Sequence, residues 1–125
     1  MSAIARKNLI AVVDDDELVR GALQRLLKAS SLGAVSFGSA EDLLKSGQLP
    51  DIACLIVDIR MPGMSGLELQ AKLKAERCRI PIIFITAHGD AKMRTRAMRD
   101  GAVKFLAKPF DNTVLLEAVH AALEN

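Results

Sequence analysis

Carboxylates, a hydroxyl and an ammonium group recur at equivalent places in this sequence, each directly after an apolar run. The residues that carry them are Asp14, Asp15, Asp58, Thr86 and Lys108. Two carboxylates about 4 Å apart repel each other by roughly 4 kcal/mol at an effective dielectric near 20. A divalent cation that prefers oxygen ligands, above all Mg²⁺, would offset this repulsion. The sequence therefore predicts a magnesium site, provided that the acids meet in space.

The same groups also describe a device for phosphoryl transfer. Asp58 would attack phosphorus and become an aspartyl phosphate. Mg²⁺ and Lys108 would balance the charge on the phosphoryl oxygens, and Thr86 would donate a hydrogen bond to one of them. Asp58, Thr86 and Lys108 are therefore the predicted catalytic residues, and Asp14, Asp15 and Asp58 are the predicted metal site.

Strand-like and helix-like patterns alternate along the chain and must hold these residues. Five short apolar runs predict strands, at 9–13, 35–37, 52–57, 80–85 and 103–106. A segment with helical spacing follows each run, and the fourth of these is expected to be the least amphipathic and least firmly packed. The central runs are apolar throughout, which predicts helices on both faces of the sheet. Right-handed crossovers then give an α/β domain with an open, doubly wound, five-stranded parallel sheet.

The predicted topology explains why the polar residues matter. In such sheets, ligands bind in the crevice beyond the carboxyl ends of the strands. Asp14, Asp15, Asp58, Thr86 and Lys108 all follow strand ends, so we expect them on one edge. The next two acids, at positions 16 and 17, are predicted to cap the first helix.

Composition limits the other functions that the chain can have. Its 125 residues suit one domain, 1–125, and a net charge of +2 without a dense basic run or any Trp or Tyr argues against direct binding to nucleic acid. Cys54 and Cys78 lack metal-site spacing, which favours reduced thiols and a cytoplasmic location. Neither a signal peptide nor a membrane span is readable. The cationic positions of the fourth helix are interpreted as a solvated face.

The whole chain resembles the receiver domain of two-component response regulators. The matching segments are V-V-D-D-D at 12–16, L-I-V-D-I-R-M-P-G-M-S-G at 55–66, I-F-I-T-A at 83–87 and F-L-A-K-P-F at 105–110. The resemblance implies a flavodoxin-like fold with strand order 2-1-3-4-5. It also implies a sensor histidine kinase or phosphotransfer protein as partner, and a switch whose own activity is limited to self-phosphorylation and self-dephosphorylation.

The resemblance also implies roles for individual residues. Asp58 would be the phosphoacceptor, Asp15 and Asp58 direct Mg²⁺ ligands, and Asp14 a helper that commonly acts through water. The backbone carbonyl of Arg60 would be a further ligand. Arg60 and His88 resemble the nitrogen-fixation type of regulator, whose receiver precedes a helix-turn-helix DNA-binding domain, and both are expected to tune the phosphate lifetime.

The output of the switch is implied in the same way. Thr86 and Phe105 resemble the family's switch pair, and Lys108–Pro109 its special X-Pro bond, which is often cis. Phosphorylation would remodel the surface made by the fourth helix and the fifth strand. That surface would then pair with a second receiver or release a C-terminal effector that controls transcription.

Two alternatives belong to other functional classes. Asp14 and Asp16 after an apolar strand also sketch a haloacid-dehalogenase-type phosphatase, with Asp14 as nucleophile and Asp16 as the acid. The acidic pair that such a phosphatase would carry downstream of Lys108 is missing, and 125 residues leave no room for its cap, the insert that recognises the substrate. A receiver-like binding module without phosphorylation is the other alternative, and the full set of site residues argues against it. Nucleotide binding is also disfavoured, because neither a P-loop nor a dinucleotide-binding fingerprint follows the first strand.

Overall fold

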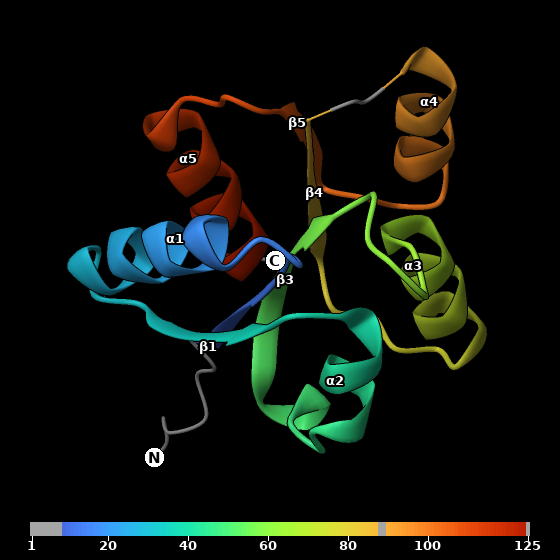
Figure 1. Ribbon diagram of the computed structural model, residues 1–125, viewed down its shortest axis with the longest axis horizontal. Helices are drawn as coiled ribbons and strands as arrows, with labels where there is room; N and C mark the ends of the chain where they lie inside the picture. The colour runs from blue at the N-terminus through green and yellow to red at the C-terminus, as the bar shows by residue number, and fades with distance from the viewer. Residues whose placement is uncertain (1–8, 88–89, 125) are drawn as a thin grey trace.

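A five-stranded parallel sheet with helices on both faces forms the protein (Figure 1). The computed structural model describes residues 9–87 and 90–124. In chain order, the elements are β1 (Leu9–Val13), α1 (Glu17–Ala29), β2 (Gly33–Phe37), α2 (Ala40–Lys45), a short 3₁₀ helix η2 (Leu49–Asp51), β3 (Ile52–Asp58), α3 (Gly66–Ala75), β4 (Ile82–Thr86), α4 (Ala91–Arg99), β5 (Lys104–Ala107) and α5 (Asn112–Leu123). The strand order β2-β1-β3-β4-β5 confirms the predicted topology. Within this part of the chain, no helix is both long enough and apolar enough to cross a membrane.

The apolar runs of the three central strands, β1, β3 and β4, are buried on two sides. In β1, Ile10 and Val12 pack in the layer that includes α1 and α5, whereas Ala11 and Val13 pack in the layer with α2, α3 and α4. All four residues are fully buried. Figure 1 shows α1 and α5 on one side of the sheet and the other three helices on the opposite side. Because alternate residues enter different layers, a central strand must be apolar at every position.

A side-chain cap fixes the point at which each α-helix begins. The caps are Asp16, Ser39, Ser65, Asp90 and Asp111, in the order of the five helices. Each cap accepts a hydrogen bond from a backbone N–H of the first turn, which would otherwise lack a partner. The Asp16 cap agrees with the prediction from the sequence. The caps also set the length of the loops that leave the carboxyl edge of the sheet.

Helix α4 differs in part from expectation. Ala97 is the single buried residue among its nine positions, whereas α3 buries four of ten, so α4 is weakly packed as predicted. The prediction that α4 is the least amphipathic helix is wrong. Met93 and Ala97, one turn apart, face the core, and the charged positions lie outside. In α3, by contrast, Leu67 and Leu69 are two positions apart and lie on nearly opposite sides of the helix, so its apolar residues are spread more evenly around it.

Gly66 allows the end of the loop after β3 to pack against that strand. A Cβ atom at this position would lie 2.7 Å from the carbonyl oxygen of Asp58 and 2.9 Å from the Cα atom of Ile59. Both are backbone atoms, which cannot rotate away as a flexible side chain can. The Gly66 N–H also donates to the carbonyl oxygen of Ile59 at 2.9 Å. The first turn of α3 is thus held directly against the strand that carries Asp58.

Replacing Gly66 by Ala should therefore destabilise the fold. We expect Gly66→Ala to lower the free energy of unfolding by about 1–3 kcal/mol through overpacking. Gly21→Ala is the matched control, since its Cβ atom would meet only the Arg25 guanidinium, at 3.4 Å. Gly21 lies inside α1, so this change should stabilise the protein by up to about 1 kcal/mol. Urea unfolding measures both, and equal stability of the two variants would contradict the packing argument.

Candidate functional site

The predicted site residues lie at one edge of the sheet. Asp58 and Thr86 are the last residues of β3 and β4, Asp14 directly follows β1, and Lys108 directly follows β5. Parallel pairing aligns these carboxyl ends. The backbone N–H of Lys108 also donates to the carbonyl oxygen of Thr86 at 2.8 Å. Residues spread over almost the whole sequence therefore meet in one place.

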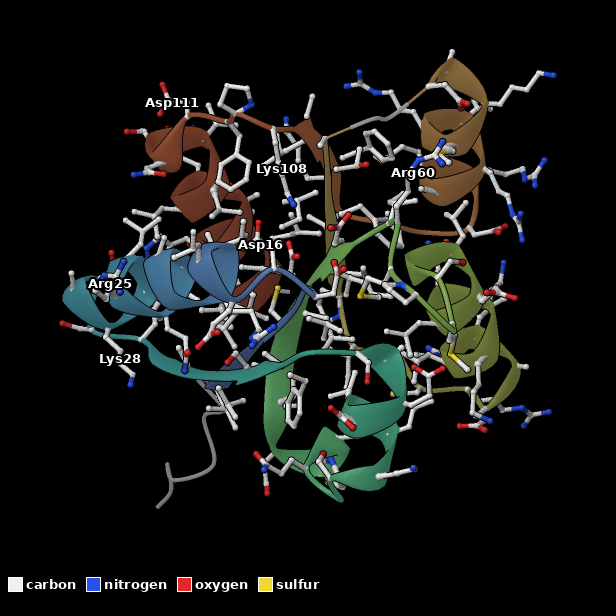
Figure 2. The ribbon with its side chains drawn as sticks, in the orientation of Figure 1. Asp16, Arg25, Lys28, Arg60, Lys108 and Asp111 are labelled. Atoms are coloured by element: carbon white, nitrogen blue, oxygen red, sulfur yellow. The ribbon has the colours of Figure 1, made fainter. Side chains whose placement is uncertain are left out.

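Lys108 connects two of the acids. Its Nζ atom lies 3.0 Å from Oδ2 of Asp14 and 3.3 Å from Oδ2 of Asp58. Figure 2 shows the lysine side chain extending from the end of β5 toward the ends of the neighbouring strands. One carboxylate oxygen from each of Asp14, Asp15 and Asp58 lies within 4.8 Å of the other two. Asp14 is fully buried, Asp58 is 7% exposed, and Asp15 is open to solvent.

This environment disfavours the charge on Asp58. Burial raises the pKa of its carboxyl group above the ordinary value, and the charge of Asp14 raises it further. The N–H of Arg60, 3.1 Å from Oδ1, and the ammonium of Lys108 oppose this shift without reversing it. Burial lowers the pKa of Lys108, but its hydrogen bond to Asp14 and the two acidic charges outweigh burial and raise the pKa overall. An additional cation would therefore stabilise ionised Asp58.

The donor set fits Mg²⁺. Three carboxylates and one ammonium group carry three negative charges and one positive charge, so these four groups leave a net charge of −2. Mg²⁺ binds through one or two carboxylates and keeps several water ligands. The exposed Asp15 lies on the open side, where water has access. The residues present can thus hold a divalent cation beside Asp58.

The other predicted residues are placed as follows. Thr86 is fully buried, and Phe105 is buried in the core layer of α2, α3 and α4, with the guanidinium of Arg94 5.9 Å from its ring centre. The exposed Arg60 follows β3, and its side chain lies on the side of α4 (Figure 2). The Lys108–Pro109 bond is cis. His88 lies outside the described residues.

Two residues near the site were missed by the sequence reasoning. Arg20 of α1 donates from Nη1 to the carbonyl oxygen of Asp14 at 2.7 Å. Glu41 of α2 accepts at Oε2 from the backbone N–H of Met64 at 2.9 Å. Both bind backbone atoms of site loops, and such contacts leave no mark in residue spacing. The glycine at position 63 is the one weak sign of the Glu41 contact in the sequence, because a Cβ atom there would collide with Glu41.

Comparison with known proteins gives a consistent family. A family model described as "Response regulator receiver domain" matches residues 10–120. Nodulation protein W of Bradyrhizobium diazoefficiens is 49% identical over 119 residues, which cover 94% of this chain and 52% of that protein. The transcriptional regulatory protein FixJ of Azorhizobium caulinodans is 42% identical over 114 residues, covering 91% of this chain and 54% of that protein. The chain thus spans about half the length of these curated relatives.

Solved structures agree with the observed fold. The crystal structure of FixJ-N is 40% identical, with a TM-score of 0.85, and the match covers 95% of each chain. The structure of the response regulator StyR is 46% identical, with a TM-score of 0.88, and the match covers 94% of this chain and 60% of that one. The similarity therefore extends over nearly all of the present sequence.

Removing the charge of Asp58 should stabilise the metal-free protein. Because its pKa is raised, folded Asp58 holds its proton more tightly than the unfolded chain does. The contribution of Asp58 to stability should therefore fall as the pH rises above the ordinary value of 3.8 and stay lower at neutral pH. Asp58→Asn should lack this fall and gain about 1 kcal/mol at pH 7, the low end of the repulsion between close carboxylates.

Urea unfolding in EDTA at a series of pH values checks this expectation. Glu117→Gln, at an exposed position of α5, is the charge-matched control. We expect it to follow the wild-type pH profile. An Asp58→Asn profile that coincides with wild type would show that the acids do not repel each other in the fold.

Proposed function

The chain belongs to the response regulator receiver family, and on this premise we propose that it accepts a phosphoryl group on Asp58 from a sensor histidine kinase or a phosphotransfer protein. The observation that carries the proposal is the position of Lys108, which contacts both Asp14 and Asp58 within a cluster of three acids. The proposal covers residues 1–125 as one receiver domain. It places the reaction in the cytoplasm, where the sequence leads us to expect the protein.

Each group at the site has a task in the transfer. A carboxylate oxygen of Asp58 attacks phosphorus, forming a P–O bond as the P–N bond to the donor histidine breaks. The electron pair of that bond stays on the imidazole nitrogen, which takes a proton from solvent. Lys108, 3.3 Å from Oδ2 of Asp58, is in reach of an oxygen of the incoming group, and Thr86 donates a hydrogen bond to another.

Mg²⁺, when bound, supplies positive charge that offsets the acids and the phosphoryl oxygens. Asp15 and Asp58 would hold it directly, Asp14 would assist, and the carbonyl of Arg60 would be a further ligand. Water ends the signal by attacking phosphorus, which returns the electron pair to the Asp58 carboxylate and releases inorganic phosphate. Arg60 and His88 would set the rate of this step, so the protein is a self-dephosphorylating switch and not a turnover enzyme.

Burial argues against the phosphatase alternative, which needs Asp14 as nucleophile. Asp14 and Asp58 each accept a backbone N–H and the Lys108 ammonium, so their hydrogen bonds do not distinguish them. Asp14, however, is fully buried. Asp58 retains some exposure at the strand end. Asp58 is therefore the better placed of the two carboxylates to meet an incoming phosphorus atom.

Intact mass after incubation with acetyl phosphate and Mg²⁺ tests the phosphoacceptor. Wild type should gain about one phosphoryl group, with acetate as the leaving group, and should gain none in EDTA. Asp58→Asn should gain none at that site. Full labelling of Asp58→Asn, with the label on Asp14, would favour the phosphatase instead.

The output surface would be α4 with β5. Movement of Thr86 toward the phosphoryl group would vacate space that Phe105 could fill, and α4 is the least buried helix nearby. The equilibrium between two arrangements of this surface would shift on phosphorylation. The remodelled surface would pair with a second receiver or release an attached effector. The FixJ relative is named a transcriptional regulatory protein. This name supports a separate effector domain, and not the receiver, as the part that binds DNA.

Amide exchange across residues 90–106 tests this output. With a beryllofluoride mimic of the phosphoryl group, wild-type protection there should change by about threefold or more, since weakly packed elements respond first. Thr86→Ala should still accept phosphate on Asp58 yet show less than about a third of that response. Thr113→Ala, at an exposed position of α5, should respond as wild type. Identical wild-type protection with and without the mimic would contradict the switch.

A further inference from the structure

The loop between β3 and α3 must hold both the Asp58 carboxylate and the Arg60 carbonyl in position. It comprises residues 59–65, here called the acceptor loop, and it follows Asp58 directly. Two hydrogen bonds fix its two ends: from the N–H of Arg60 to Oδ1 of Asp58, at 3.1 Å, and from the N–H of Gly66 to the carbonyl oxygen of Ile59, at 2.9 Å. A third, from the N–H of Ile59 to the carbonyl oxygen of Ile85 at 3.1 Å, ties the start of the loop to β4. None of these three hydrogen bonds reaches residues 61–65.

Glu41 supplies a contact from a distant part of the chain. Its Oε2 atom accepts from the backbone N–H of Met64 at 2.9 Å, across 23 residues of sequence. The same oxygen lies against the backbone of Gly63, where a Cβ atom would be only 2.6 Å away. Gly63 also has φ +76°, a conformation that favours glycine. The loop is therefore shaped to receive this carboxylate closely.

Helix α2 is a firm base for Glu41. Its neighbours Ala40 and Leu43 are both fully buried, and Ser39 caps the helix by accepting from the N–H of Asp42. The hydrogen bond from the Met64 N–H holds the pKa of Glu41 below its ordinary value. At neutral pH the residue is thus a charged acceptor, which is the stronger kind. The contact joins a helix anchored by two buried residues to Met64, near the end of the acceptor loop that leads into α3.

We propose that Glu41 is a positioning residue for the magnesium and phosphoryl site. By holding the Met64 amide, it keeps the acceptor loop in the arrangement that presents the Arg60 carbonyl and the Asp58 carboxylate to one cation. The close packing of Gly66 on the backbone of Asp58 makes a displaced loop disturb the acceptor as well. This inference rests on the proposed function, and Glu41 itself touches neither the cation nor phosphorus.

Mg²⁺ affinity, measured by calorimetric titration, is the main readout. Residues that orient metal ligands typically change affinity by about 10–100-fold when mutated, and we expect about tenfold weaker binding in Glu41→Ala. Glu41→Gln keeps an acceptor oxygen at the same reach and should stay within about threefold of wild type. Glu41→Asp keeps the charge but is one methylene shorter, so it should weaken binding about as much as Ala. Asp42→Ala, one residue along α2 and exposed, removes an equal charge and should bind within about twofold of wild type.

Two further readouts separate positioning from a loss of stability. In the absence of Mg²⁺, exchange of the Met64 amide should be at least about tenfold faster in Glu41→Ala than in wild type, because its acceptor is gone. Phosphorylation by acetyl phosphate in Glu41→Ala should need more Mg²⁺ but should reach the wild-type rate at saturation.

The outcomes that overturn the proposal are distinct from those that overturn the phosphoacceptor assignment. Wild-type Mg²⁺ affinity in Glu41→Ala, or an equal loss in Asp42→Ala, would remove Glu41 from the site. Should Glu41→Ala fail to fold, equal affinities of Glu41→Gln and Glu41→Asp would do the same. A wild-type protein that binds no Mg²⁺ and takes up no phosphate would instead overturn the proposed function.

Discussion

The repulsion between Asp14 and Asp58, balanced in part by Lys108, is the constraint on which the site depends. The two acids are buried within reach of one ammonium group. Removing Lys108 would leave both buried carboxylates without a compensating charge, which is strongly unfavourable. Lys108 is 94 residues from Asp14 and 50 from Asp58. The balance therefore exists only when β1, β3 and β5 end at the same edge.

The sheet is buried on both faces, and this burial stabilises the fold enough to tolerate the repulsion between the acids. The side chains of the central strands fill two apolar layers, and their removal from water offsets the unfavourable energy of the poorly balanced acidic site. The same imbalance gives the site its chemistry. An environment that disfavours the charge on Asp58 favours any cation that can reach it, and a cation beside a partly exposed carboxylate prepares that carboxylate for an incoming phosphoryl group.

Loops of the site are held by contacts from outside them as well as by their own ends. Asp16 and Ser65 cap the helices that follow the acidic residues. Arg20 binds the carbonyl of Asp14, and Glu41 binds the amide of Met64. Irregular backbone has many alternatives, so precise placement of a ligand requires such supporting contacts. Helix α4 has one buried residue, and a buried hydrogen bond from Gln70 Nε2 of α3 to the carbonyl oxygen of Ala97, at 3.0 Å, holds it.

Sequence alone determined the strands, their order through the family resemblance, and the residues of the acidic cluster. Each of these depends on local pattern: an apolar run such as 52–57 is a strand buried on two faces, and a polar residue directly after it must lie at the sheet edge. The contact of Lys108 with both acids, the burial of Asp14, and the roles of Arg20 and Glu41 were decided by the tertiary structure. Hydrogen bonds between a side chain and a distant backbone group depend on how loops approach one another. Backbone groups are the same in every residue, so such bonds have no signature in the sequence. The amphipathic character of α4, by contrast, was misjudged from the sequence itself, since Met93 and Ala97 lie one turn apart and the charged residues lie on the exposed side.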